Sequence, residues 1–171
     1  EGGGLRRVGS CKVMLAADAA NAFNTQFRRT IENAVREVIP RATKAFMWAY
    51  GDRTPLRDAD GKIMLHSSRG VLQGDPMAGM YWALAPTSIL KTLARRYQGS
   101  DGYAIHNDTT LAGEVRNIAP MFDELKEKWA AIGVDMQPSK CAVLRGEEHS
   151  AMDTIWQSRG FLPDRCRGDG I

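Results

Sequence analysis

The sequence has only three cysteines, Cys11, Cys141 and Cys166, and they lie far apart. An odd number at wide spacing argues against the disulfide framework of a small secreted domain. The three histidines do not stand beside them at zinc-finger spacing, so we expect no structural zinc. No apolar run approaches ~18 residues, so no membrane-spanning helix is expected, and the glycine-rich start is not a signal peptide. These absences predict an intracellular protein, nuclear or cytoplasmic, that is not secreted and has no membrane partner.

Charge of one sign is not in large excess either. The chain carries 23 Lys and Arg against 20 Asp and Glu, a net charge of +3. That balance does not by itself imply nucleic acid. The basic residues do form local clusters, which suit either phosphate contacts or solvated helix faces. They are Arg6-Arg7, Arg28-Arg29, Arg36 with Arg41 and Lys44, and Lys91 with Arg95-Arg96.

The order of the predicted elements indicates an α+β fold in one domain, which 171 residues can supply with a sizeable core. The apolar run at 12–17 is predicted as a buried strand because it is too short for a core helix. We then expect helices at 24–38 and 42–50, a hairpin around 54–65, a long helix at 76–97, a tight β-hairpin at 103–112, a helix at 117–132, and strands at 134 and 141–144. Pro86 is expected to kink or divide the long helix.

Asp18 ends the first predicted strand and opens the run Asp18-Ala19-Ala20-Asn21-Ala22-Phe23-Asn24. A strand holds a carboxylate in place, and the aromatic five residues later is suited to the floor of a sugar pocket. A tight hairpin with an acidic tip can place a second carboxylate opposite Asp18. Two such carboxylates can hold two divalent ions about 3.5–4 Å apart, as in-line phosphoryl displacement requires.

The segment 68–76 is a loop with a second set of candidate contacts. Gly70 and Gly74 allow the backbone to approach a ligand closely. Gln73 offers a neutral amide that can touch a base or sugar, and Asp75 before Pro76 is expected to cap the helix that follows. For this segment alone, an ordinary loop before a helix is the simpler interpretation.

Together these segments resemble the palm of a reverse transcriptase. The motifs are Asp-x-x-x-Ala-Phe-Asn at 18–24, Arg-Gly-Val-Leu-Gln-Gly-Asp-Pro at 69–76, and a hairpin ending Asp-Thr-Thr-Leu at 108–111. Gly133-Val134 followed by Lys140-Cys141 fits the next family element, so the resemblance covers 12–145. It is most similar to the branch of non-LTR retrotransposons and group II introns. It implies a ferredoxin-like βαββαβ core, an antiparallel sheet with helices on one face, and an RNA-directed DNA polymerase.

The resemblance also implies substrates, cofactors and residue roles. A DNA primer 3′-hydroxyl would be extended with deoxynucleoside triphosphates on an RNA template. Asp18 would bind two Mg²⁺ or Mn²⁺ ions with help from the Ala19 carbonyl, and Asp108 would lie at the metal site. Phe23 would stack under the sugar and exclude a 2′-hydroxyl. Lys140 would approach the triphosphate and protonate the leaving pyrophosphate. The loop residues expected to contact substrate are Arg69, Gln73 and Gly74.

One position departs from the family pattern. The family hairpin reads aromatic-x-Asp-Asp, whereas this chain has Asn107 before Asp108. An amide oxygen still ligates Mg²⁺, but a hard cation prefers carboxylate. A loss of ~4 kcal/mol of transition-state stabilisation would slow the reaction roughly a thousandfold. The alternatives are therefore a degenerate, non-catalytic palm that serves as a binding or scaffold module, or an unrelated α+β domain in which the motifs arose by chance.

For domain organisation, we expect a palm with part of the fingers over 1–146. Residues 147–171 are expected to form a poorly ordered polar tail that leads toward a primer-grip and thumb region missing from this chain.

Overall fold

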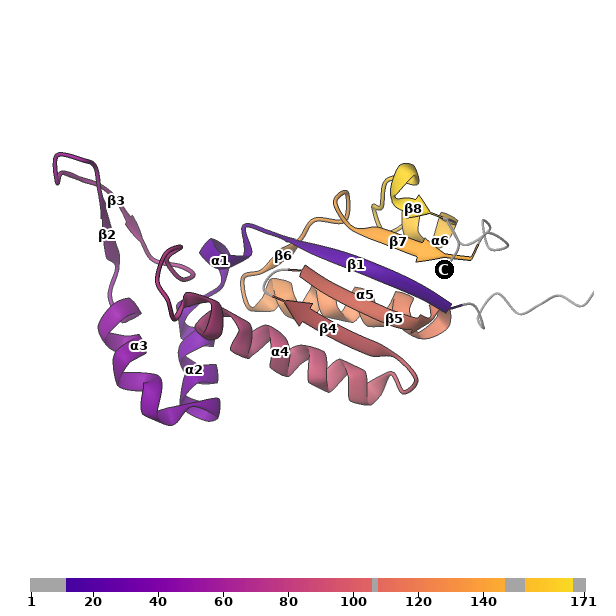
Figure 1. The fold of residues 1–171 in the computed structure, drawn as a ribbon, viewed down its shortest axis with the longest axis horizontal. Coiled ribbons are helices and arrows are strands. Elements are labelled where there is room, and N and C mark those ends of the chain that lie inside the picture. The colour runs from indigo at the N-terminus through magenta and orange to yellow at the C-terminus, as the bar shows by residue number, and fades with distance from the viewer. Residues whose placement is uncertain (1–11, 106–107, 147–152, 168–171) are drawn as a thin grey trace, which may run out of the picture.

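A computed structural model describes residues 12–105, 108–146 and 153–167, and confirms the α+β class (Figure 1). A twisted sheet in the order β4-β5-β1-β7-β8 forms the larger part, and β6 pairs with the end of β1. All strand pairs are antiparallel except β7 with β8. The strands are β1 (Lys12–Ala20), β4 (Asp101–Ile105), β5 (Asp108–Glu114), β6 (Asp135–Met136), β7 (Ala142–Arg145) and β8 (Cys166–Arg167).

The core topology is the predicted βαββαβ unit. In chain order it comprises β1, α4 (Ala78–Arg96), β4, β5, α5 (Val115–Ala131) and β7. Their spatial order, β4-β5-β1-β7, places the first strand between the third and the fourth strands of the unit. Both helices lie on the same face of the sheet (Figure 1). This arrangement is a palm-like fold.

Alternation along β1 explains why only one face of the sheet is covered. Val13, Leu15 and Ala17 are buried, whereas Met14 and Ala16 on the other side of the strand are exposed. Side chains along a strand alternate between faces, so the apolar set packs on α4 and α5 and the opposite face stays open. Leu15 is completely buried, and a side chain of this kind stabilises the fold by roughly 1.5–3 kcal/mol.

A smaller group of elements stands at the other end of the molecule (Figure 1). The short helix α1 (Ala22–Thr25) leads into α2 (Arg28–Val38), a 3₁₀ turn and α3 (Thr43–Tyr50). A two-stranded hairpin of β2 (Thr54–Arg57) and β3 (Ile63–Ser67) then extends outward. Its turn at Asp60-Gly61 is where the sequence predicts it.

Three expectations differ from the structure. The predicted helix 24–38 is two helices, because the backbone at Gln26 and Phe27 is extended. Pro86 does not divide α4, which is one helix and begins at Ala78 rather than at residue 76. The predicted tail is ordered over 153–167, where it forms α6 (Asp153–Gln157), a 3₁₀ turn and β8.

Residues 153–167 are ordered because their side chains pack on the core and form an ion pair with β7. Trp156 and Phe161 are buried, and the Phe161 ring lies 5.3 Å from that of Phe122 on α5. Arg145 at the end of β7 pairs with Asp153 at 2.7 Å.

Among the described helices, none combines the length and apolar character that crossing a bilayer requires.

Candidate active site

The end of β1 brings together the two carboxylates that the motifs predict to meet. The antiparallel register of β1 and β5 opposes Asp18 directly to Asp108. Directly opposed residues project from the same face, with Cβ atoms about 4.5–5.5 Å apart. That face is the open one, because the next residues inward on each strand, Ala17 and Thr109, are buried. Asn107 lies outside the described residues, so its place in the site stays a prediction.

A pocket of about 390 Å³ opens beside Asp18. Five residues that the sequence predicts for the site line it: Asp18, Ala19, Phe23, Gln73 and Lys140. They come from the end of β1, from α1, from the loop before α4 and from the loop between β6 and β7. Residues not predicted for the site complete the lining: Ala20, Asn21, Ala22, Asn24 and Gln137.

The turn that carries Phe23 is fixed by its own backbone and by α4. Asn21 adopts the left-handed conformation, with φ 46°, which Asn tolerates better than most residues. The buried Trp82 donates a hydrogen bond from Nε1 to the Ala22 carbonyl at 2.8 Å. Its ring stacks on Phe23 with centroids 5.5 Å apart and an interplanar angle of 18°. Phe23 is therefore presented to the pocket on a rigid support.

The loop that carries Lys140 is bonded to the backbone of Asp18. Gln137 donates its N–H to the Asp18 carbonyl at 2.9 Å. The Asp18 N–H points to the Cys141 sulfur at 3.3 Å, and that thiol faces the Gln137 carbonyl at 3.4 Å. Burial raises the pKa of the Cys141 thiol, so the group is neutral at pH 7.

Sequence reasoning assigned no role to Gln137 or Cys141. The only available signal was a polar amide directly after a short strand, close to the predicted Lys140. Their contacts with Asp18 depend on tertiary pairing of β1 with β6, which no local pattern reveals.

The glycine-rich loop is attached to α1 through backbone hydrogen bonds. Gly70 donates to the Gln26 carbonyl at 2.7 Å, and Val71 donates to the Phe23 carbonyl at 2.8 Å. Gly70 has φ +60°, and a Cβ atom there would lie 2.0 Å from the Phe23 oxygen. Gly70 therefore lies close to the protein's own backbone, and the approach to a ligand that the sequence predicts there stays a prediction.

Two predicted contact residues do not line the pocket. Arg69 places its guanidinium 5.1 Å from the centre of the Phe27 ring. Gly74 is exposed and has no heavy atom within 4 Å of where a Cβ would be. Their roles toward substrate stay predictions.

Tyr50 on α3 holds the second half of the loop. Its hydroxyl donates to the Asp75 carboxylate and accepts the Leu72 N–H at 3.2 Å. Asp75 also accepts the Met77 N–H at 2.8 Å, in the turn before α4, so it does not cap the helix as the sequence predicts: the N-cap of α4 is Met77, with no side-chain cap hydrogen bond. Burial, reinforced by the hydrogen bond to Asp75, raises the pKa of Tyr50 to about 12.

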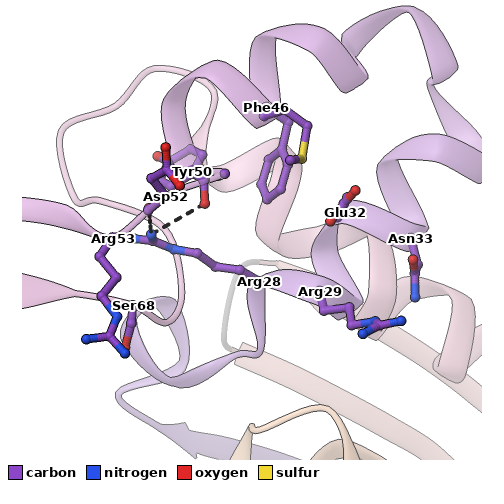
Figure 2. Close-up of a pocket in the computed structure, with 11 residues that line it drawn as sticks. Arg28, Arg29, Glu32, Asn33, Phe46, Tyr50, Asp52, Arg53 and Ser68 are labelled. Atoms are coloured by element: carbon purple, nitrogen blue, oxygen red, sulfur yellow. Dashed lines mark hydrogen bonds between the residues drawn. The ribbon is translucent and has the colours of Figure 1, made fainter.

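A second pocket, of about 480 Å³, lies between α2 and α3 (Figure 2). Arg28 extends into it, and its donors are taken by neutral protein groups. Nη1 reaches the Asp52 carbonyl at 2.7 Å, and Nε reaches the Gly70 carbonyl at 3.1 Å. Nη2 reaches the hydroxyls of Ser67 at 3.1 Å and Thr54 at 3.3 Å. Burial lowers the pKa of Arg28 from its ordinary value, and its contacts make it a structural clamp at the base of the β2–β3 hairpin.

The carboxylates beside the first pocket are suitable ligands for a divalent ion. Mg²⁺ is commonly bound by one or two carboxylates together with substrate phosphates. Asp18 and Asp108, opposed on one face, supply that set. Within the described part of the chain no group of three or more His, Cys, Asp or Glu residues could hold a metal, so substrate oxygens and water would complete the coordination.

The palm-like core has a reverse-transcriptase-like fold, because its solved structural neighbours are telomerases. Apo telomerase from Candida tropicalis superposes with a TM-score of 0.65 at 8% identity, over 81% of this chain and 29% of that chain. Telomerase from Candida albicans in complex with a TWJ fragment of telomeric RNA gives 0.61 at 11% identity, over 78% and 27%. The chain thus spans less than a third of these telomerases, and identities this low show the fold alone. No protein-family model and no curated protein matches the sequence.

Proposed function

We propose that this chain is the palm of an RNA-directed DNA polymerase. It would add deoxynucleotides to a primer 3′-hydroxyl on an RNA template. The observation that carries the proposal is the opposition of Asp18 and Asp108 beside a pocket lined by Phe23, Gln73 and Lys140. The RNA bound by the Candida albicans telomerase supports nucleic acid as the partner. The motif at 69–76 supports the branch of non-LTR retrotransposons and group II introns, and an intracellular location follows from that function.

The positions of the side chains support the following roles within this proposal. Asp18 and Asp108 would hold Mg²⁺ or Mn²⁺, with the Ala19 carbonyl at the same edge. The bound ions would activate the attacking hydroxyl and stabilise the charge on the leaving pyrophosphate. Phe23, supported by Trp82, would form the floor of the sugar pocket. Lys140, on the loop bonded to Asp18, would meet the triphosphate and give a proton to pyrophosphate.

The register also bears on Asn107, which replaces the first aspartate of the family hairpin. Asp108 occupies the position opposite Asp18 and can supply the second carboxylate. The proposal therefore assigns the second metal contact to Asp108, and the role of Asn107 stays a prediction from the sequence.

The test combines primer extension with metal binding. With an RNA template, a DNA primer and Mg²⁺, Asp18→Asn and Asp108→Asn should each reduce extension roughly a thousandfold, the equivalent of ~4 kcal/mol. Mn²⁺ binding followed by electron paramagnetic resonance should weaken in both variants. Asp101→Asn, an exposed aspartate at the start of β4, is the matched control and should change neither readout. Full extension by Asp18→Asn would disprove the assignment.

A non-catalytic palm is the second candidate, and Asn107 is the observation that favours it. It predicts binding of primer–template without Mn²⁺ binding and without extension, even at millimolar metal. Metal binding separates the two candidates, and extension gained by Asn107→Asp would show that this position alone is limiting.

A further inference from the structure

The outer face of α3 carries the one tryptophan of this chain that is open to solvent. Trp48 is 91% exposed, whereas Trp82, Trp129 and Trp156 are completely buried. Trp is normally among the more buried residue types, because its large ring gains most from leaving water. An indole left this open is a candidate for contact with a partner.

The surroundings of Trp48 are cationic. Residues three or four apart share a helix face, which places Lys44 beside Trp48. Arg41 lies one turn before Lys44, in the 3₁₀ turn that precedes α3. Phe46 and Tyr50, on the opposite side of α3, are buried in the core. The segment 38–51 contains two basic residues and no Asp or Glu.

The acidic groups nearest in sequence lie at the two ends of this segment, Asp52 four residues after Trp48 and Glu37 four residues before Arg41. Glu37 and Asp52 flank the segment and are exposed. Glu32 on the neighbouring α2 is already paired with Arg36 at 2.6 Å. Arg29 and Arg53, at the rim of the second pocket, add positive charge at the same end of the molecule (Figure 2).

We propose that this face of α3 binds single-stranded nucleic acid, with a base stacked on Trp48 and phosphates held by Arg41 and Lys44. Stacking on an aromatic ring beside cations is the general chemistry of single-strand binding, and it requires a base whose face is not covered by a neighbour. A protein-docking surface would surround the indole with apolar side chains, whereas here the helical spacing places Lys44 and Arg41 on the same side as Trp48. The surface lies at the end of the molecule away from the sheet (Figure 1), so it is separate from the pocket and does not require catalysis there.

The exposed indole supplies a direct assay. Twelve-nucleotide oligo(dT) or oligo(rU), titrated at low salt, should quench tryptophan emission to saturation, and the signal reports Trp48 because the other three indoles are buried. Anisotropy of a labelled oligonucleotide gives the affinity. Trp48→Leu should weaken binding ~10-fold, within the usual range for one stacked base, and Trp48→Phe should retain most of it. Replacing Arg41 and Lys44 by Gln should reduce the salt slope by about 1.4, since each phosphate contact on a single strand contributes about 0.7.

The controls keep this inference apart from the polymerase proposal. Lys91→Gln, an exposed lysine on α4, should bind as the parent does. Asp18→Asn should leave the quenching of Trp48 unchanged, so failure of one proposal does not imply failure of the other. Binding without quenching, equal affinity of Trp48→Leu, or a preference for duplex would overturn the inference. Emission that depends on protein concentration instead of oligonucleotide would also overturn it, in favour of a contact between two copies.

Discussion

Trp82 shows how one side chain connects the core to the candidate site. It is completely buried, and its only polar atom has a partner in the Ala22 carbonyl. The same ring stacks on Phe23, which lines the pocket. Because a stacked aromatic ring has little freedom to tilt, helix α4, which carries Trp82, fixes the position of Phe23 in the pocket.

Tyr50 gives a pH-dependent prediction. Its pKa is raised to about 12 in the folded protein from an ordinary value near 10, so its contribution to stability is complete below pH 10 and is lost as pH rises toward 12. Tyr50→Phe should lower the free energy of unfolding at pH 7 by about 1–3 kcal/mol. The variant should also show a smaller loss of stability between pH 10 and 12.

Urea unfolding at several pH values provides the measurement. Tyr103→Phe, an exposed tyrosine on β4, is the control and should match the parent throughout. An unchanged slope for Tyr50→Phe between pH 10 and 12 would contradict the raised pKa that burial and the Asp75 contact give Tyr50.

The site residues that could be predicted from the sequence are those that belong to recognisable motifs. Asp18, Phe23, Gln73 and Lys140 were each assigned to one site, and they line one pocket. Cys141 had no role in the prediction although it contacts the Asp18 backbone, because that contact joins residues far apart in the chain.

Among the elements, the loop before α4 is joined to the site by backbone hydrogen bonds from Gly70 to Gln26 and from Val71 to Phe23. Gly70→Ala would place a Cβ against the Phe23 oxygen and also strain a left-handed residue. We expect a loss of about 3 kcal/mol or more in the free energy of unfolding, with weaker nucleotide binding as Phe23 moves. Gly74→Ala, with φ +96° and open space around it, should lose only about 1–2 kcal/mol. Equal losses in urea unfolding would show that the loop does not press on Phe23.

The elements that the sequence mispredicted have tertiary explanations. The break between α1 and α2 is stabilised by distant backbone groups: Gly70 donates to Gln26, and Phe27 donates to Ile132 at 2.9 Å. Apolar periodicity cannot report such contacts. The order at 153–167 was missed because its composition is polar, while its stability comes from Trp156 and Phe161 packing into the core.

At the scale of the whole molecule, Arg28 ties the outer elements together. It bonds the base of the β2–β3 hairpin and the loop at Gly70, while β3 itself is largely exposed. Arg28→Ala should therefore loosen the hairpin before the sheet. Hydrogen exchange of the β2 and β3 amides should become ~10-fold faster or more, about 1.4 kcal/mol of local stability. The adjacent Arg29→Ala should leave these rates unchanged, and a uniform increase over the sheet would contradict a local clamp.

The pairing of β1 has a consequence for how the chain is synthesised. Its partners, β5, β6 and β7, all lie beyond residue 107. β1 therefore leaves the ribosome before any of the strands with which it pairs, and contacts between segments this distant are slow to form. During that interval the apolar side of β1 has nothing from the sheet to pair with. A nascent chain of this kind is most in need of a chaperone before its hairpin tip has been translated.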